Sequence, residues 1–182
     1  SNKLTYSLLY SEADLYTKTV QEMPNLEFEL FYKQQLIGTF SAHIGGNHNL
    51  YNILAAIGLG ICQNIDPVRA AHKACEYIPQ NNRSQWIQKG KTHILLDAYN
   101  ANPSSVEVGI KSFSTLNGKK AIFLGDMLEL GNHSQNEHKE IYNLFLSLHF
   151  DEIFFCGSEY QEAIGNYPFK FETVDSLLAW LD

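Results

Sequence analysis

The sequence has few cysteines and no long apolar run. Its three cysteines, Cys62, Cys75 and Cys156, lie far apart and form no CxxC pair. This argues against a disulfide framework or a zinc site and is typical of buried thiols in a reducing cytoplasm. No apolar stretch approaches the ~20 residues that span a membrane, and no basic segment followed by an apolar one marks a signal peptide. We therefore expect a cytoplasmic protein without membrane insertion.

The sequence also lacks a basic surface and the common nucleotide fingerprints. Its formal net charge is −7 and it has no run of Lys or Arg, so nucleic acid is not expected as a partner. There is no GxxxxGK[ST] loop and no GxSxG elbow, and Gly58 and Gly60 lack the third glycine of a dinucleotide fingerprint. If the chain binds a nucleotide, it must use residues outside these known fingerprints.

Hydrophobic residues make up 45% of the 182 residues, enough for a substantial core. Residues 3–44 are β-rich, with strands predicted at 4–9, 27–32 and 36–43 and a turn at 33–35. Apolar residues at helical spacing predict a helix over 47–63, and Asp66 followed by Pro67 predicts the start of another, which runs to about residue 77. The polar stretch 79–82 predicts a linker, which divides the chain into domains 1–79 and 80–182.

The second domain alternates strands with helices. Strands are predicted at 92–97, 120–124, 152–156 and 169–172, and helices at 102–116, 134–149, 158–164 and 175–181. This alternation implies βαβ units and a mostly parallel sheet, an α/β, Rossmann-like fold preceded by the β-rich and helical first part. Ligands of such sheets bind beyond the carboxyl ends of the strands, so residues after Leu96, Leu124 and Cys156 are candidates.

Two asparagines are candidates for a base-binding site. Asn49 and Asn52 lie three apart in the first turn of the predicted helix, so they share a face, next to His48. A side-chain amide offers one acceptor and two donors, which match the edge of an adenine. The alternative is that Asn47 or Asn49 caps the helix and that His48 is a loop residue.

Asp97 and Arg83 are candidates for polar ligand contacts. Asp97 ends an apolar strand, where a carboxylate could accept hydrogen bonds from ribose hydroxyls or hold a cation, and Asn100 and Asn102 follow closely. Arg83, just past the linker, could reach phosphate oxygens. The alternatives are loop and helix-capping residues in the first case and a solvated arginine in the second.

The acids and histidines of residues 126–138 suggest a metal site at first sight. Asp126, Glu129, His133 and His138, however, match no compact ligand spacing and straddle a loop and a helix. We expect no metal ligands in this chain.

Four stretches together resemble one family. GNHNLYNILAA at 46–56 resembles the G-x-HNxxNxLAA signature of Mur ligases. DAYNANP at 97–103, LGDMLELG at 124–131 and NNRS at 81–84 are similar to segments of the type that adds D-alanyl-D-alanine. They occur in the family's order, and the resemblance covers nearly the whole chain.

The resemblance implies an ATP-dependent ligase of peptidoglycan precursor synthesis. Such enzymes join D-alanyl-D-alanine to UDP-N-acetylmuramoyl-tripeptide: ATP phosphorylates the terminal carboxylate, and the dipeptide amine attacks the acyl phosphate. The implied cofactors are ATP and Mg²⁺, whose positive charge offsets that of the phosphates.

The resemblance also implies residue roles. Asn49 and Asn52 match residues that hold adenine, and Asp97 matches the acid that binds ribose. Arg83 matches the catalytic arginine that reaches toward the phosphates. Tyr99, Asn100 and Asn102 match a stretch expected near the dipeptide or the nucleotide.

Parts of the family pattern have no match here. The phosphate loop, the metal-binding acids, the modified lysine and a KGSR-like segment are absent from the sequence. We therefore expect residues 1–79 to be the tail of a central ATP-binding domain, and the chain alone to be inactive. The alternatives are a non-catalytic nucleotide-binding or regulatory module of the same fold and another Mur-type amino-acid ligase.

Overall fold

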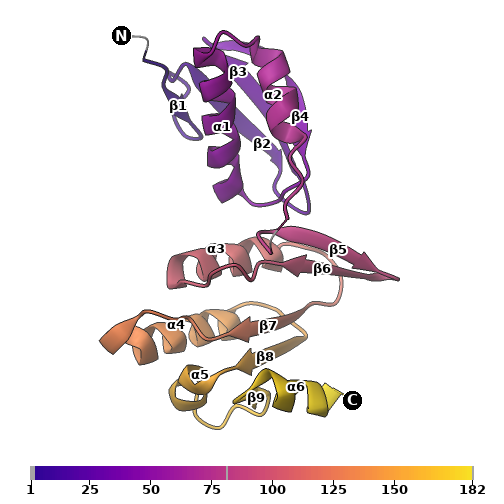
Figure 1. Ribbon diagram of the computed structural model, residues 1–182, viewed down its shortest axis with the longest axis vertical. Helices are drawn as coiled ribbons and strands as arrows, with labels where there is room; N and C mark the ends of the chain where they lie inside the picture. Colours follow the sequence, from indigo (N-terminus) through magenta and orange to yellow (C-terminus); the bar gives the residue numbers. More distant parts are fainter. Residues whose placement is uncertain (1–2, 81, 182) are drawn as a thin grey trace. The chain divides into compact units, whose positions relative to one another are not determined.

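The computed structural model describes residues 3–80 and 82–181, which form two compact units, residues 1–99 and 100–182 (Figure 1). Asn81, which belongs to the predicted linker and to the NNRS stretch, lies outside the described residues. Each unit has a hydrophobic core of its own.

The first unit begins with a four-stranded sheet in chain order. Its strands are β1 (Tyr6–Ser7), β2 (Leu15–Gln21), β3 (Leu26–Tyr32) and β4 (Gln35–Ala42). β1 is parallel to β2, and the other neighbours are antiparallel. The strands predicted at 27–32 and 36–43 are confirmed with small shifts. The strand predicted at 4–9 is reduced to β1, and β2 was not predicted.

Burial alternates along β3, an internal strand of the sheet. Leu26, Phe28 and Leu30 are fully buried, and the residues between them are half-buried. Lys33 and Gln34 connect β3 to β4 with φ angles of 48° and 69°. Positive φ at both central residues is the signature of a type I′ turn, whose twist matches the strands it joins.

Two helices, α1 (Asn47–Cys62) and α2 (Pro67–Cys75), cover one face of this sheet (Figure 1). The predicted apolar stripe of α1 is buried at Leu50, Ile53, Leu54 and Ile57. The predicted start of α2 is confirmed, because the carboxylate of Asp66 accepts a hydrogen bond from the Arg69 N–H at 3.0 Å.

The first unit ends with an antiparallel pair of strands, β5 (Gln85–Lys89) and β6 (Thr92–Leu96). The expectation that residues 92–97 open the parallel sheet was wrong. β6 pairs with β5 in a two-stranded sheet. β5 was not predicted, since its sequence QWIQK carries three polar residues and only a weak strand pattern.

The second unit has a parallel sheet in the order β7 (Ala121–Gly125), β8 (Glu152–Cys156) and β9 (Lys170–Phe171). Its helices are α3 (Pro103–Ser114), α4 (Ser134–Ser147), α5 (Ser158–Ala163) and α6 (Val174–Leu181), with a short 3-10 turn η1 (Gly131–His133) before α4. The predicted α/β class with a parallel sheet is confirmed.

β8 is the central strand, and both of its faces are packed. Phe155 is fully buried and contacts the rings of Tyr142 and Phe145 on α4. Phe154, on the opposite face, packs against Phe123 of β7 and Trp180 of α6. This burial on both sides explains why the run EIFFC is continuously apolar after its first residue.

Candidate functional site

Two glycines set the geometry at the start of α1. A Cβ at Gly45 would lie 2.3 Å from the sulfur of Met23 and 2.6 Å from the carbonyl oxygen of Pro24. Gly46 has a φ of 91°, and a Cβ there would lie 2.5 Å from the ring of His48. Both positions therefore require glycine. Gly46 is the N-cap and has no side chain, and the carboxylate of Glu22 accepts from the Asn47 N–H at 3.3 Å, so the alternative that Asn47 or Asn49 is the cap was wrong.

Asn49 turns its amide nitrogen back toward the protein. Its Nδ2 donates to the carbonyl oxygen of Gly45 at 2.8 Å and to Oγ of Ser84 at 3.3 Å, and lies 3.0 Å from Nε2 of His48. Asn52, one turn along α1, is exposed, and its side chain makes no hydrogen bond among residues 3–80 and 82–181.

Ser84 joins Asn49 to Asp97. Its hydroxyl accepts from Asn49, and its backbone N–H donates to Oδ1 of Asp97 at 3.1 Å. Ser84 is only 8% exposed. The sequence identified Asn49 and Asp97 separately but gave Ser84 no role, although its place next to Arg83 in the NNRS stretch was a usable signal.

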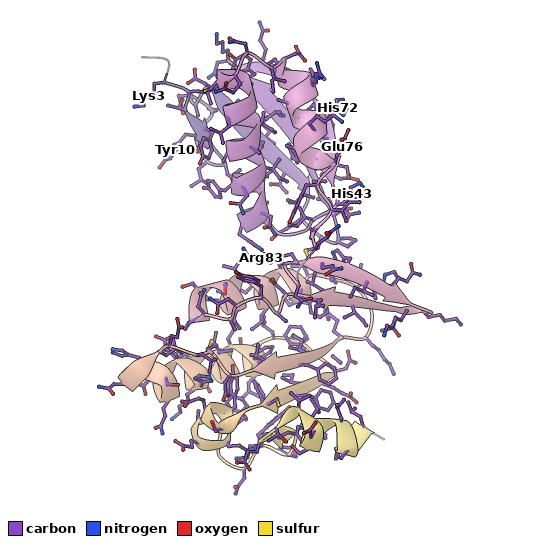
Figure 2. All side chains as sticks on the ribbon, viewed as in Figure 1. Lys3, Tyr10, His43, His72, Glu76 and Arg83 are labelled. Atoms are coloured by element: carbon purple, nitrogen blue, oxygen red, sulfur yellow. The ribbon has the colours of Figure 1, made fainter. Side chains whose placement is uncertain are left out.

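Arg83 lies in the turn that leads into β5 (Figure 2). Its neighbours Asn82 and Ser84 have φ angles of 59° and 46°, which are unusual for residues other than glycine and often occur at functional sites. The carbonyl oxygen of Asn82 accepts from the N–H groups of Ala98 and Tyr99, at 2.8 and 3.2 Å. This pairing fixes the turn against the residues that follow β6.

The guanidinium of Arg83 stacks on Tyr99. Its Cζ lies 3.5 Å from the centre of the ring, the geometry of a cation–π contact. Tyr99 is 62% exposed, so the stack is open to solvent. One connected network thus presents three polar groups: the amide carbonyl of Asn49, the carboxylate of Asp97 and the guanidinium of Arg83. These are the groups that can bind a base amine, ribose hydroxyls and phosphate.

The remaining predicted site residues belong to the second unit. Asn102 caps α3: its Oδ1 accepts from the Ser105 N–H at 3.0 Å, and its own N–H donates to Ser105 Oγ at 3.3 Å. This is a capping box, which uses the carbonyl of the side chain and leaves its NH₂ group for other partners. Asn100 is exposed and makes no hydrogen bond within the described part of the chain.

Asp126 and His138 have structural partners in the second unit. The Asp126 carboxylate accepts from the N–H groups of Glu159 and Tyr160 at the start of α5, at 3.1 and 3.2 Å. His138 is fully buried; its Nε2 accepts from the Met127 N–H at 3.0 Å, and its Nδ1 lies 2.7 Å from the Ser134 carbonyl oxygen. These bonds require a neutral imidazole with its proton on Nδ1. The hydrogen bonds of Asp126 and Met127 thus fix the first part of the 124–131 segment against α4 and α5.

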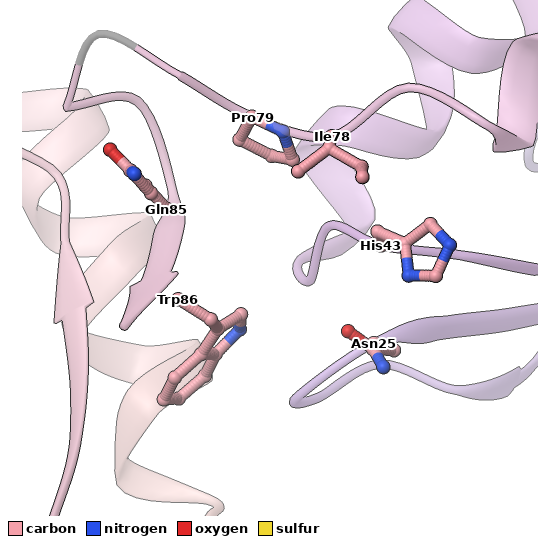
Figure 3. Close-up of a pocket in the computed structure, with 6 residues that line it drawn as sticks. All are labelled: Asn25, His43, Ile78, Pro79, Gln85 and Trp86. Atoms are coloured by element: carbon pink, nitrogen blue, oxygen red, sulfur yellow. The ribbon is translucent and has the colours of Figure 1, made fainter. Parts of the chain in front are cut away.

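A cavity of about 220 Å³ opens elsewhere in the first unit (Figure 3). It is lined by Asn25, His43, Ile78, Pro79, Gln85 and Trp86. The indole N–H of Trp86 donates to the carbonyl oxygen of Pro24 at 2.8 Å, which fixes the ring. None of the predicted site residues lines this cavity.

No helix within 3–80 and 82–181 combines the length and apolar character of a membrane span. Within the same ranges, no three His, Cys, Asp or Glu side chains are grouped as metal ligands would be.

The chain is similar to curated ligases over about two thirds of its length. It is 37% identical over 114 residues to the UDP-N-acetylmuramoyl-tripeptide–D-alanyl-D-alanine ligase of Buchnera aphidicola, which covers 62% of this chain and 25% of the relative. It is 36% identical over 122 residues to the Bacillus subtilis ligase of the same name, covering 65% and 27%. The chain thus spans about a quarter of the length of these relatives.

Solved structures share the fold. A crystal structure of MurF from Acinetobacter baumannii superposes with a TM-score of 0.82 at 23% identity, over 98% of this chain and 39% of that one. MurF from Thermotoga maritima in complex with ADP gives 0.75 at 20% identity, over 93% and 39%. The family model described as "Mur ligase, glutamate ligase domain" matches residues 82–174, just over half of the chain. The chain belongs to the Mur ligase family.

Proposed function

We propose that this chain supplies the adenosine-binding part of an ATP-dependent ligase that joins D-alanyl-D-alanine to UDP-N-acetylmuramoyl-tripeptide. The observation that carries the proposal is the network of Asn49, Ser84 and Asp97, with Arg83 beside it. Curated relatives of 37% and 36% identity bear the name of this activity, which supports the choice of substrates.

Each polar group of the network has a proposed role. Asn49, with Asn52 on the same helix, contacts the adenine. Asp97 accepts hydrogen bonds from the ribose hydroxyls, and Arg83 contacts the phosphates, where its planar guanidinium can bind two oxygens at once. Tyr99 holds Arg83 by stacking. Asn100 and Asn102 are proposed to contact the dipeptide or the nucleotide through their free amide groups.

The donor set fits the nucleoside better than the metal. An amide and a carboxylate complement a base and a ribose, whereas the described residues contain no group of three His, Cys, Asp or Glu side chains placed to bind a metal together. ATP supplies the phosphoryl group that activates the carboxylate when it is bound. What the residues of this chain contribute is binding and orientation of the nucleoside end.

The domain boundary near residue 80 is part of the proposal. The family model starts at residue 82, which supports a boundary in the polar stretch 79–82. We propose that residues 1–79 belong to the central ATP-binding domain and 80–182 to the C-terminal domain. Because the sequence contains no phosphate-binding loop, we also propose that this chain alone forms no amide bond.

The test of the activity is phosphate release by the longest natural polypeptide that contains this chain. With ATP, Mg²⁺ and UDP-N-acetylmuramoyl-tripeptide, D-alanyl-D-alanine should stimulate release, and meso-diaminopimelate, Lys or Glu should not. Stimulation by one of the other amines would assign a different ligase of the family. Amide formation by the 182-residue chain alone would contradict its proposed inactivity.

A second candidate is a ligase that adds a single amino acid. The UDP-N-acetylmuramate–L-alanine ligase of Desulforamulus reducens is 26% identical over 113 residues, covering 62% of this chain. L-alanine with UDP-N-acetylmuramate therefore belongs in the same assay. If no substrate pair stimulates release but nucleotide still binds, the chain belongs to a non-catalytic, nucleotide-binding member of the family.

A further inference from the structure

The cavity of Figure 3 lies within the first unit and is built from separate parts of the chain. Asn25 precedes β3 and His43 follows β4. The Leu26 N–H donates to the carbonyl oxygen of Ile44 at 2.9 Å, and this bond holds the two strand ends together. The rest of the lining comes from the segment after α2 and from β5. The cavity is therefore framed by regular structure.

An apolar part of the lining is held in place by a hydrogen bond. The indole of Trp86 is half-buried, and its N–H donates to the carbonyl oxygen of Pro24 at 2.8 Å, which fixes the ring. Pro79 and the exposed side chain of Ile78 line the same cavity. An indole held in this way offers a flat ligand an aromatic partner, in an offset stack or edge to face.

Three polar side chains line the cavity and are not used by the fold. The amides of Asn25 and Gln85 and the imidazole of His43 make no hydrogen bond among residues 3–80 and 82–181. A side-chain amide has one acceptor and two donors, so it can pair with another primary amide through two hydrogen bonds. The six described lining residues include no Asp, Glu, Lys or Arg, so a charged ligand would find no counter-ion among them.

The size of the cavity suits a ligand of one ring. Its volume is about 220 Å³, which is less than the ~300–1,000 Å³ of sites for drug-sized ligands. We propose that this cavity is a binding site for an uncharged planar ring that carries a primary amide, which contacts the indole of Trp86 and pairs with the amide of Asn25. The cavity is separate from the network around Ser84, so ligand binding here does not depend on the proposed nucleotide site.

The experiment follows the indole N–H signals of the 182-residue chain by nitrogen–proton NMR, with nicotinamide as the probe. The chain has two tryptophans, Trp86 and Trp180, and the variant Trp180→Phe assigns their signals. Nicotinamide should shift the Trp86 signal in a saturable way, with a dissociation constant of about 1–10 mM, because a single ring makes few contacts. The signal of Trp180, which packs against Phe154 in the second unit, should not move.

A second ligand and a variant test the chemistry of the site. Nicotinate has the same ring with a carboxylate, which has no donors, in place of the amide. At about pH 8, where a free imidazole is uncharged, it should bind roughly fivefold more weakly than nicotinamide. Asn25→Ala removes no side-chain hydrogen bond of the described residues and should weaken nicotinamide binding roughly fivefold. Asn136→Ala, at an exposed position on α4, is the control and should bind nicotinamide like the wild type.

Each part of the proposal can fail separately. An absent or non-saturable shift of the Trp86 signal would overturn the site, and so would equal shifts of both tryptophan signals, since these would mean general contact with aromatic rings. Equal affinities for nicotinate and nicotinamide would overturn the ligand class. An unchanged affinity in Asn25→Ala would overturn the pairing with Asn25. All of these results leave the nucleotide site as it is, because ADP titration tests that site independently.

Discussion

The carboxylate of Asp97 accepts a hydrogen bond from the backbone N–H of Ser84 at 3.1 Å. Ser84 is buried, so its N–H depends on this acceptor. Asp97 therefore stabilises the turn around Arg83 as well as offering its second oxygen to a ligand. Substitutions of Asp97 should therefore lower both the stability of the fold and the affinity for the ligand.

Replacing Asp97 should destabilise the protein most when the new side chain has no hydrogen-bond acceptor. Asp97→Ala leaves the buried N–H unsatisfied and should lower the free energy of unfolding by about 1–3 kcal/mol. Asp97→Asn keeps an acceptor and should cost less. Urea unfolding measures the loss, and ADP titration should show weaker binding in both variants. Glu12→Ala, an exposed acid of the same unit, is the control; an Asp97→Ala variant as stable as this control would contradict the bond's importance.

The positions of Asn49 and Asp97 could be predicted because each breaks a pattern. Asn49 stands at the start of an apolar helix, and Asp97 ends an apolar strand. Periodicity likewise predicted α1, α4 and β8 within a few residues. These elements bury one stripe or one run, so their sequences carry a clear signal.

The contacts between segments could not be predicted. Ser84 meets Asn49 across 35 positions of sequence, and nothing local to either residue encodes that distance. β5 and β6 pair with each other because of a two-residue turn that includes Gly90, at φ 60°, although the strand-helix alternation indicated a parallel neighbour. β2 was missed since its second half is exposed and carries no apolar alternation.

Arg83 and Tyr99 should act as a pair in phosphate binding. Arg83→Ala should weaken ADP binding about tenfold and leave adenosine binding nearly unchanged, because only ADP carries phosphates. Tyr99→Phe keeps the aromatic ring and should resemble the wild type. Tyr99→Ala frees the guanidinium, and it should weaken ADP binding about threefold, in line with ~0.5–1 kcal/mol for an exposed cation–π contact. Calorimetric titration with both ligands measures these effects.

Arg69→Ala is the matched control for Arg83, since Arg69 is also exposed and lies on α2. It should bind ADP and adenosine like the wild type. Equal losses for adenosine and ADP in Arg83→Ala would mean that Arg83 supports the fold of the site and does not contact phosphate.

His138 should be a strong determinant of stability in the second unit. His138→Phe preserves much of the ring's volume but removes the acceptor for Met127 N–H and the donor to the Ser134 carbonyl oxygen. The buried N–H of Met127 then loses its acceptor and the half-buried carbonyl oxygen of Ser134 loses this donor, which should cost about 1–3 kcal/mol in urea unfolding. His149→Phe, at an exposed position, is the control and should change stability little. Similar stabilities for the two variants would show that the bonds of His138 are dispensable.

Cys75 should make the first unit sensitive to alkaline pH. Burial raises the pKa of its thiol to about 11, above the ~8.5 of an unfolded cysteine. A raised folded-state pKa means that the contribution is complete below the unfolded pKa and is lost as pH rises toward the folded one, since the unfolded state releases its proton first. Between pH 8 and 11 the wild type should lose about 2–3 kcal/mol that Cys75→Ala does not lose. Urea unfolding across this range measures the difference, in which the titration of Lys and Tyr cancels. Cys62→Ala removes an exposed thiol and should lose stability with pH as the wild type does. If Cys75→Ala also loses stability as the wild type does, the buried thiol is not the source of the pH dependence.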